Sequence, residues 1–159
     1  MSLKDVSQAL DIISKHPSLT FISGPCDPAL VAAAEAAIGS RFPPTYREFV
    51  TRVGTLMFAG LEIYGITGPN FERSSVPNGI WATLNERRTA HLPHDLLVVG
   101  DDGMAGLYCI ELREGLEGRV IVYGPDASTP TEQPREFIAN DFGEFILAEV
   151  RQRLRNLDG

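Results

Sequence analysis

The chain has 159 residues, 43% of them hydrophobic and 22% charged, which is ordinary for one soluble globular domain. Its 14 lysines and arginines against 21 aspartates and glutamates give a net charge of −7, which argues against a general nucleic-acid binder and favours a basic partner. Without a disulfide framework, a run of about 20 apolar residues or a signal-peptide pattern, the sequence predicts a single cytoplasmic domain over 1–159 that contacts no membrane.

Two helices are predicted within the first forty residues. Apolar residues at helical spacing predict the first of them over 3–13, and the short apolar run 19–22 predicts an edge strand. Asp27 is a typical N-cap residue, and Pro28 suits the first turn of a second helix. Gly39 can adopt the positive φ that ends this helix.

A third helix and a strand are predicted next. Pro44 suits the first turn of a helix with apolar residues at i, i+3, i+4 and i+7, and Gly54 is expected to end it. The following residues, 56–66, are expected to form one strand. Gly60 and Gly65 within it indicate a bulge or a close approach of two backbone segments.

The second half predicts a helix over 78–91 and then an antiparallel meander. The apolar run 96–100 is typical of a central strand, and strands over 107–112 and 120–123 follow after tight turns. Asp141 is expected to cap the last helix, which has acidic residues early and arginines late, as the helix dipole favours. Helices first, strands in the middle and a closing helix predict an α+β fold.

The turn Gly100-Asp101-Asp102-Gly103 is the densest polar motif. Two adjacent carboxylates could hold a hard cation, but residues 104–107 bring no side-chain oxygen to continue an EF-hand pattern. Asp-Gly is also a strong hairpin signal, so we favour turn chemistry over an ion site.

The sequence offers no catalytic or metal-binding signature. The three histidines and two cysteines lack metal-ligand spacing, and neither a nucleophile elbow nor a phosphate-binding glycine loop is present. We therefore expect a protein that is not an enzyme and that uses no cofactor or metal.

Two features are candidates for partner binding. Trp81 could anchor an interface, although a single tryptophan on a helix more often packs into the core. Several carboxylates lie in or near the strand region, and on one shared face they could steer a basic partner. The alternative is a solvated face without a partner. The carboxylates are Glu62, Asp101, Asp102, Glu111, Glu114 and Glu117. Tyr64 lies on the same strand as Glu62 and is a further candidate contact.

The order of motifs resembles the SUKH superfamily, in particular its Smi–Knr type. The matching segments are AEAAIGSRFPPTYREFV, FAGLEIYGI, LLVVGDDGMAGLYCIEL, VIVYGP and DFGEFILAEV, and together they extend over about 28–150. Family members often carry Gly-Gly-Asp after the central turn, where this chain has Ala105-Gly106, so that acidic position is lost here. Glu111 matches the later acidic position of the family.

The resemblance implies an α+β fold with a strongly bent, mainly antiparallel sheet flanked by helices. It also implies a bacterial immunity protein that occludes a cognate toxin, often a nuclease, without catalysis. A basic toxin would agree with the net charge of −7. A scaffold or regulatory module for an endogenous partner is the alternative, and an enzyme or small-ligand binder would need a deep pocket with converging polar groups.

Overall fold

The computed structural model describes residues 2–114, 118–124, 131 and 133–158, and it confirms the α+β class. The described helices are α1 (Leu3–Ser14), the 3₁₀ turn η1 (Pro17–Leu19), α2 (Pro28–Ile38), α3 (Pro44–Val53), α4 (Gly79–Ala90) and α5 (Phe142–Asp158). The described strands are β1 (Thr20–Ile22), β2 (Leu56–Phe58), β3 (Leu61–Ile63), β4 (Leu96–Asp101), β5 (Leu107–Glu111), β6 (Val120–Tyr123) and β7 (Arg135–Ala139).

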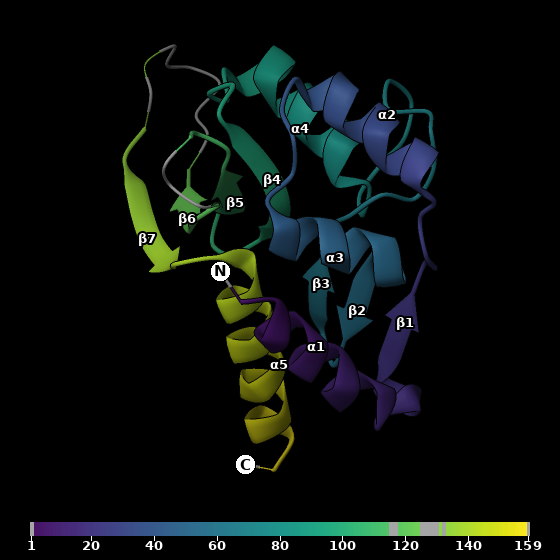
Figure 1. The fold of residues 1–159 in the computed structure, drawn as a ribbon. Helices are drawn as coiled ribbons and strands as arrows, with labels where there is room; N and C mark the ends of the chain where they lie inside the picture. The colour runs from purple at the N-terminus through teal and green to yellow at the C-terminus, as the bar shows by residue number, and fades with distance from the viewer. Residues whose placement is uncertain (1, 115–117, 125–130, 132, 159) are drawn as a thin grey trace.

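The strands form two antiparallel sheets, with the orders β1-β2-β3 and β4-β5-β6-β7. In Figure 1, α1 and α3 lie across the three-stranded sheet, and α4 lies beside α2 at the other end of the molecule. α5 packs against α1, so the first and last helices of the chain lie side by side. None of the helices in the described ranges is long and apolar enough to cross a membrane.

The prediction of a single strand over 56–66 is wrong. The chain turns back after Phe58, and Phe58 pairs with Leu61 across a two-residue hairpin. Ala59 and Gly60 in the turn have φ of 48° and 85°, the combination of signs in a type I′ turn. Gly60 therefore serves the turn, because the left-handed region costs glycine little.

The two sheets are joined through a bulge in β4. The pairing with β5 shifts between Val98 and Gly100, which leaves Val99 as the extra residue. The carbonyl of Val99 accepts a hydrogen bond of 2.8 Å from the backbone N–H of Tyr64, just after β3. The acidic turn that follows β4 is consequently held beside β3.

Two apolar clusters cover the two faces of the four-stranded sheet. In β4, Leu97 and Val99 belong to the main core with α1, α2, α3 and α5, whereas Leu96 and Val98 face a smaller cluster beneath α4. Burial on both faces explains why β4 has a continuous apolar sequence.

The predicted helix ends are confirmed by their hydrogen bonds. The Asp27 side chain accepts from Leu30 N, and Gly39 closes α2 with a φ of 86°. The side chain of Asn78 caps α4, and Asp141 Oδ1 accepts from Glu144 N at 2.9 Å at the start of α5. These caps satisfy backbone N–H groups that the helices leave unpaired.

Candidate binding groove

The turn after β4, the strand β3 and helix α5 enclose an acidic groove of about 270 Å³. The described residues that line it are Gly60, Leu61, Glu62, Tyr64, Asp101, Asp102, Gly103, Tyr108 and Arg153. Four of the residues expected to contact a partner, Glu62, Tyr64, Asp101 and Asp102, therefore lie together. They meet because the Val99 bulge places the end of β4 next to β3.

The carboxylates of the turn are held by the backbone. Asp101 Oδ1 accepts from Gly103 N at 2.6 Å, and Asp102 Oδ1 accepts from Met104 N and Gly106 N at 2.7 and 2.8 Å. These bonds are the turn chemistry expected from the motif. Within the described part of the chain, no three His, Cys, Asp or Glu residues come together as a metal site.

Tyr64 lines the groove, and its hydroxyl makes no hydrogen bond within the described part of the chain. Its side chain is only 7% exposed, and its ring packs in the smaller apolar cluster. Burial raises the pKa of Tyr64, and the nearby charges of Glu62 and Asp101 raise it further. The hydroxyl therefore stays protonated at neutral pH. No hydrogen bond to it is found within the described residues, so it can donate to or accept from an incoming group.

Five of the described lining residues were not predicted as contacts; Leu61 and Gly103 adjoin predicted residues, and three others were not expected in the groove. Tyr108 comes from β5, Arg153 from α5 and Gly60 from the hairpin turn. Alternation along β5 places Tyr108 on the same face as Ile110, but no local pattern in the sequence brings α5 to that face. Arg153 is the one cation among the described lining residues, against three carboxylates.

Glu111 does not share the face of the groove. It is 1% exposed and lies in an arginine cluster that consists of Asp95, Glu111, Arg113, Arg119 and Arg135. Its carboxylate accepts from Arg135 Nη1 at 2.6 Å and from Arg119 Nη2 at 2.8 Å. Asp95 completes the cluster, with its two oxygens 2.8 and 2.9 Å from Arg135. Of the other predicted acidic residues, Glu114 is exposed and does not line the groove, and Glu117 lies outside the described residues.

The arginine cluster should make the fold sensitive to acid. The side-chain hydrogen bond from Arg135 is the main cause that lowers the pKa of Asp95. Burial alone would raise the pKa of Glu111, but hydrogen bonds from Arg135, Arg119 and Arg113 outweigh it, so this pKa is also lowered. A lowered folded-state pKa means that the stabilisation is present above the unfolded-state pKa of about 4 and is lost as the pH falls through the folded-state value.

We therefore expect the melting temperature to fall steeply below about pH 4. Circular dichroism between pH 7 and pH 2.5 measures this dependence. Asp95→Asn should melt lower at pH 7 and show a shallower decline in acid. A decline as steep as that of the wild type would show that the cluster does not cause the acid sensitivity.

Trp81 lies apart from the groove. It is partly buried against the smaller apolar cluster and lines a cavity of only about 40 Å³ with Phe71 and Arg88. A space of this size holds water rather than a ligand. This packing agrees with the interpretation of Trp81 as a core residue. Because Trp81 is only partly buried, contact between its side chain and a partner stays a prediction.

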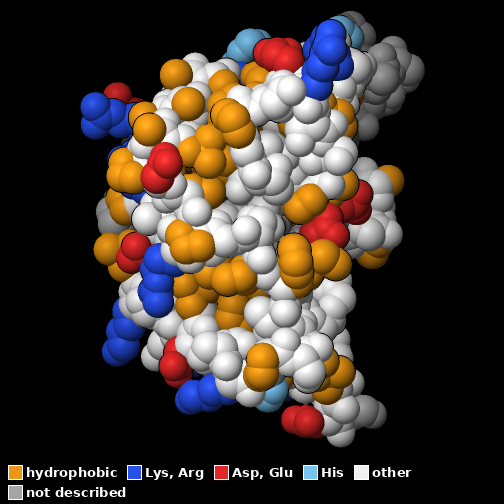
Figure 2. Space-filling view, turned by 90° about the vertical axis from the view of Figure 1, so that its right-hand side faces the viewer, with side chains coloured by type: hydrophobic (Ala, Val, Ile, Leu, Met, Phe, Trp, Pro, Cys, Tyr) orange, Lys and Arg blue, Asp and Glu red, His pale blue; other side chains and the backbone are white. Residues whose placement is uncertain are grey.

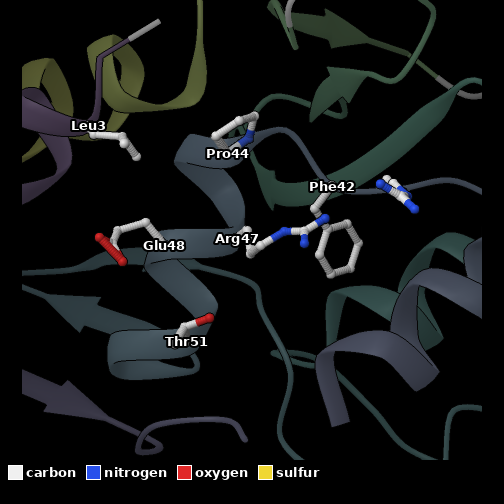
Figure 3. A pocket seen from close by; sticks show the side chains of 7 residues that line it. Leu3, Phe42, Pro44, Arg47, Glu48 and Thr51 are labelled. Atoms are coloured by element: carbon white, nitrogen blue, oxygen red, sulfur yellow. The ribbon is translucent and has the colours of Figure 1, made fainter. Parts of the chain in front are cut away.

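A second, open depression of about 500 Å³ lies between α1 and the start of α3 (Figure 3). Its polar side chains do not converge, because Arg47 reaches toward Phe42 while Glu48 points the opposite way. Arg47 is also engaged in an ion pair with Glu35. A binding site needs polar groups that converge on a ligand, so the acidic groove is the better candidate.

Comparison with known proteins gives one result that bears on the groove. A family model, SUKH_6, described as SMI1-KNR4 cell-wall, matches residues 28–146, which include β3 and the acidic turn. A search of curated proteins finds no match.

Proposed function

Because the chain belongs to the SUKH superfamily, in its Smi–Knr type, we propose that it is an immunity protein that binds a cognate bacterial toxin and blocks it by occlusion. Family membership agrees with an immunity or regulatory role. The toxin is expected to be a basic, nuclease-type effector, and the groove is expected to bind it without catalysis or a cofactor.

The observation that supports this proposal is that Glu62, Asp101 and Asp102 line one groove together with Tyr64, whose hydroxyl has no hydrogen-bond partner among the described residues. Three carboxylates against one cation among the described lining residues create a negative local potential. Such a potential speeds association with a basic surface, and the net charge of −7 adds to it. A guanidinium or ammonium group that enters the groove could donate to the carboxylates and to the tyrosine oxygen.

The test is co-expression with the toxin domain encoded beside this gene. The wild type should restore growth and form a stoichiometric complex in size-exclusion chromatography. The triple variant Glu62→Gln, Asp101→Asn, Asp102→Asn should bind at least about tenfold more weakly at low salt. The amide side chains keep the turn acceptors for Gly103, Met104 and Gly106, so the fold should be retained.

A matched control removes the same charge elsewhere. Glu48→Gln, Glu72→Gln and Asp158→Asn also take the net charge from −7 to −4, and none of these residues lines the groove. This control should bind as tightly as the wild type. Equally weakened toxin binding by both triple variants would show that only the net charge matters. If the wild type does not restore growth, the proposed function is refuted.

A further inference from the structure

The outer face of the three-stranded sheet carries an apolar pair that continues to the acidic groove. Phe21 pairs with Met57, and Met57 pairs with Glu62, so the three side chains form one row across β1, β2 and β3. The neighbours of Met57 in β2, Leu56 and Phe58, are buried on the opposite face. With strands about 4.8 Å apart, the row is about 10 Å long.

Both apolar members of the row are open to solvent. Phe21 is 61% exposed and Met57 is 45% exposed. They line a depression of about 300 Å³ with residues 18–20 and 58–60. Figure 2 views the molecule from the side of β1, and hydrophobic side chains are accessible across the middle of this view.

The apolar depression and the acidic groove adjoin at the hairpin turn. Gly60 lines both of them, and Glu62 of the groove pairs across the strands with Met57 of the depression. A bulky side chain at Gly60 would separate the two, and the positive φ of the turn favours glycine there. This part of the surface thus presents an apolar area and, beside it, three carboxylates and Tyr64, whose hydroxyl has no partner among the described residues.

We propose that this face docks a single segment of the partner that carries an apolar side chain and, about 10 Å away, a lysine or arginine. The apolar side chain packs on Phe21 and Met57, where the flexible thioether adapts to its shape. The cation enters the groove between Glu62, Asp101 and Tyr64. This proposal rests on the proposed function, since it specifies the chemistry by which the partner binds.

The negative charge of this face favours a basic segment of the partner over a second copy of the chain. Two copies that met on this face would bring the carboxylates of both grooves together, and each chain has a net charge of −7. Like charges in a contact disfavour it. A basic segment instead neutralises the excess negative charge of the groove, where Arg153 is the one cation among the described lining residues against three carboxylates.

The experiment uses a displayed library of random 12-residue peptides that is selected on the wild-type protein. The enriched peptides should combine an apolar residue with lysine or arginine. They should bind at least about tenfold more weakly to Phe21→Ala, Met57→Ala and to the triple charge variant. The control Val76→Ala, Leu157→Ala shortens two other exposed apolar side chains and should bind like the wild type. Melting temperatures confirm that all variants are folded.

Several outcomes would overturn the proposal. The first is that no peptide is enriched, and the second is that the enriched peptides lack basic residues. The third is that the peptides bind the double variant Phe21→Ala, Met57→Ala as tightly as the wild type. A dimer in light scattering that this double variant dissociates would assign the face to a second copy. Growth on co-expression with the toxin distinguishes the proposed docking face from the proposed immunity function. Undiminished rescue by Phe21→Ala, Met57→Ala refutes the docking face alone, whereas selected peptides without any rescue by the wild type refute only the immunity function.

Discussion

Gly65→Ala is expected to destabilise the folded chain by about 3 kcal/mol or more, because the added methyl group has no space. An ideal Cβ at this position would lie 1.7 Å from the carbonyl oxygen of Gly54 and 2.9 Å from its carbon. Both contacts are with backbone, so no side-chain rotation relieves them. Urea unfolding should show a lower midpoint with an unchanged slope.

The backbone around Gly65 cannot move away easily. Its N–H donates to Pro77 O at 3.0 Å, and its carbonyl accepts from Gly79 N at 2.8 Å. Ile66 N also donates to Gly54 O at 3.2 Å, which holds the two glycines against each other. Any shift that makes room for the methyl group must weaken at least one of these bonds.

Gly68→Ala is the matched control. A Cβ at Gly68 would meet nothing within 4 Å, and its backbone lies outside the left-handed region. This variant should stay within about 0.5 kcal/mol of the wild type, with a small gain from the stiffer unfolded chain. Equal losses in both variants, or none in either, would contradict the close packing of Gly54 on Gly65.

Local signals predicted the helix ends and the approach at Gly65. Asp27, Pro28 and Gly39 specify the limits of α2 through their own backbone preferences and a hydrogen bond within one turn. The glycine at position 65 indicated either a bulge or a close approach, and the structure has the close approach. The helix ends depend on neighbours in sequence, so the sequence alone was sufficient for them, whereas the contact of Gly65 with Gly54 is made only in the tertiary fold.

The hairpin between β2 and β3 was missed for the opposite reason. Its turn is Ala59-Gly60 rather than the Asn-Gly or Asp-Gly pair that usually signals a type I′ turn. Apolar residues continue on both sides of it, as they would in one strand. The turn depends on the pairing of β2 with β1 and β3, which the local sequence does not encode.

The groove was predicted in part. Glu62, Tyr64, Asp101 and Asp102 come together because a bulge at Val99 joins the two sheets, and nothing in the apolar sequence of β4 marks that bulge. Glu111 resembles the other acidic residues in sequence. Its burial is decided by Arg119 just before β6, by Arg135 in β7 and by Asp95, which only the tertiary fold brings to it.

Glu111→Gln is expected to cost about 3 kcal/mol, because it removes a buried charge that holds several arginines. Arg135 is only 15% exposed, and without Glu111 it keeps Asp95 as its carboxylate partner among the described ion pairs. For a chain of this size, each kcal/mol lowers the melting temperature by about 2–4 °C, so the loss should be about 6–12 °C. Differential scanning calorimetry at pH 7 measures it.

Glu114→Gln makes the same chemical change three residues away, at an exposed position. It should leave the melting temperature within about 2 °C of the wild type, as surface substitutions do. Toxin binding at a temperature where both variants are folded then separates a structural role from a contact role. Because Glu111 lies outside the groove, Glu111→Gln should bind the toxin as the wild type does. Weaker binding by a fully folded Glu111→Gln, with an unchanged melting temperature, would instead make Glu111 part of the interface and the arginine cluster dispensable for stability.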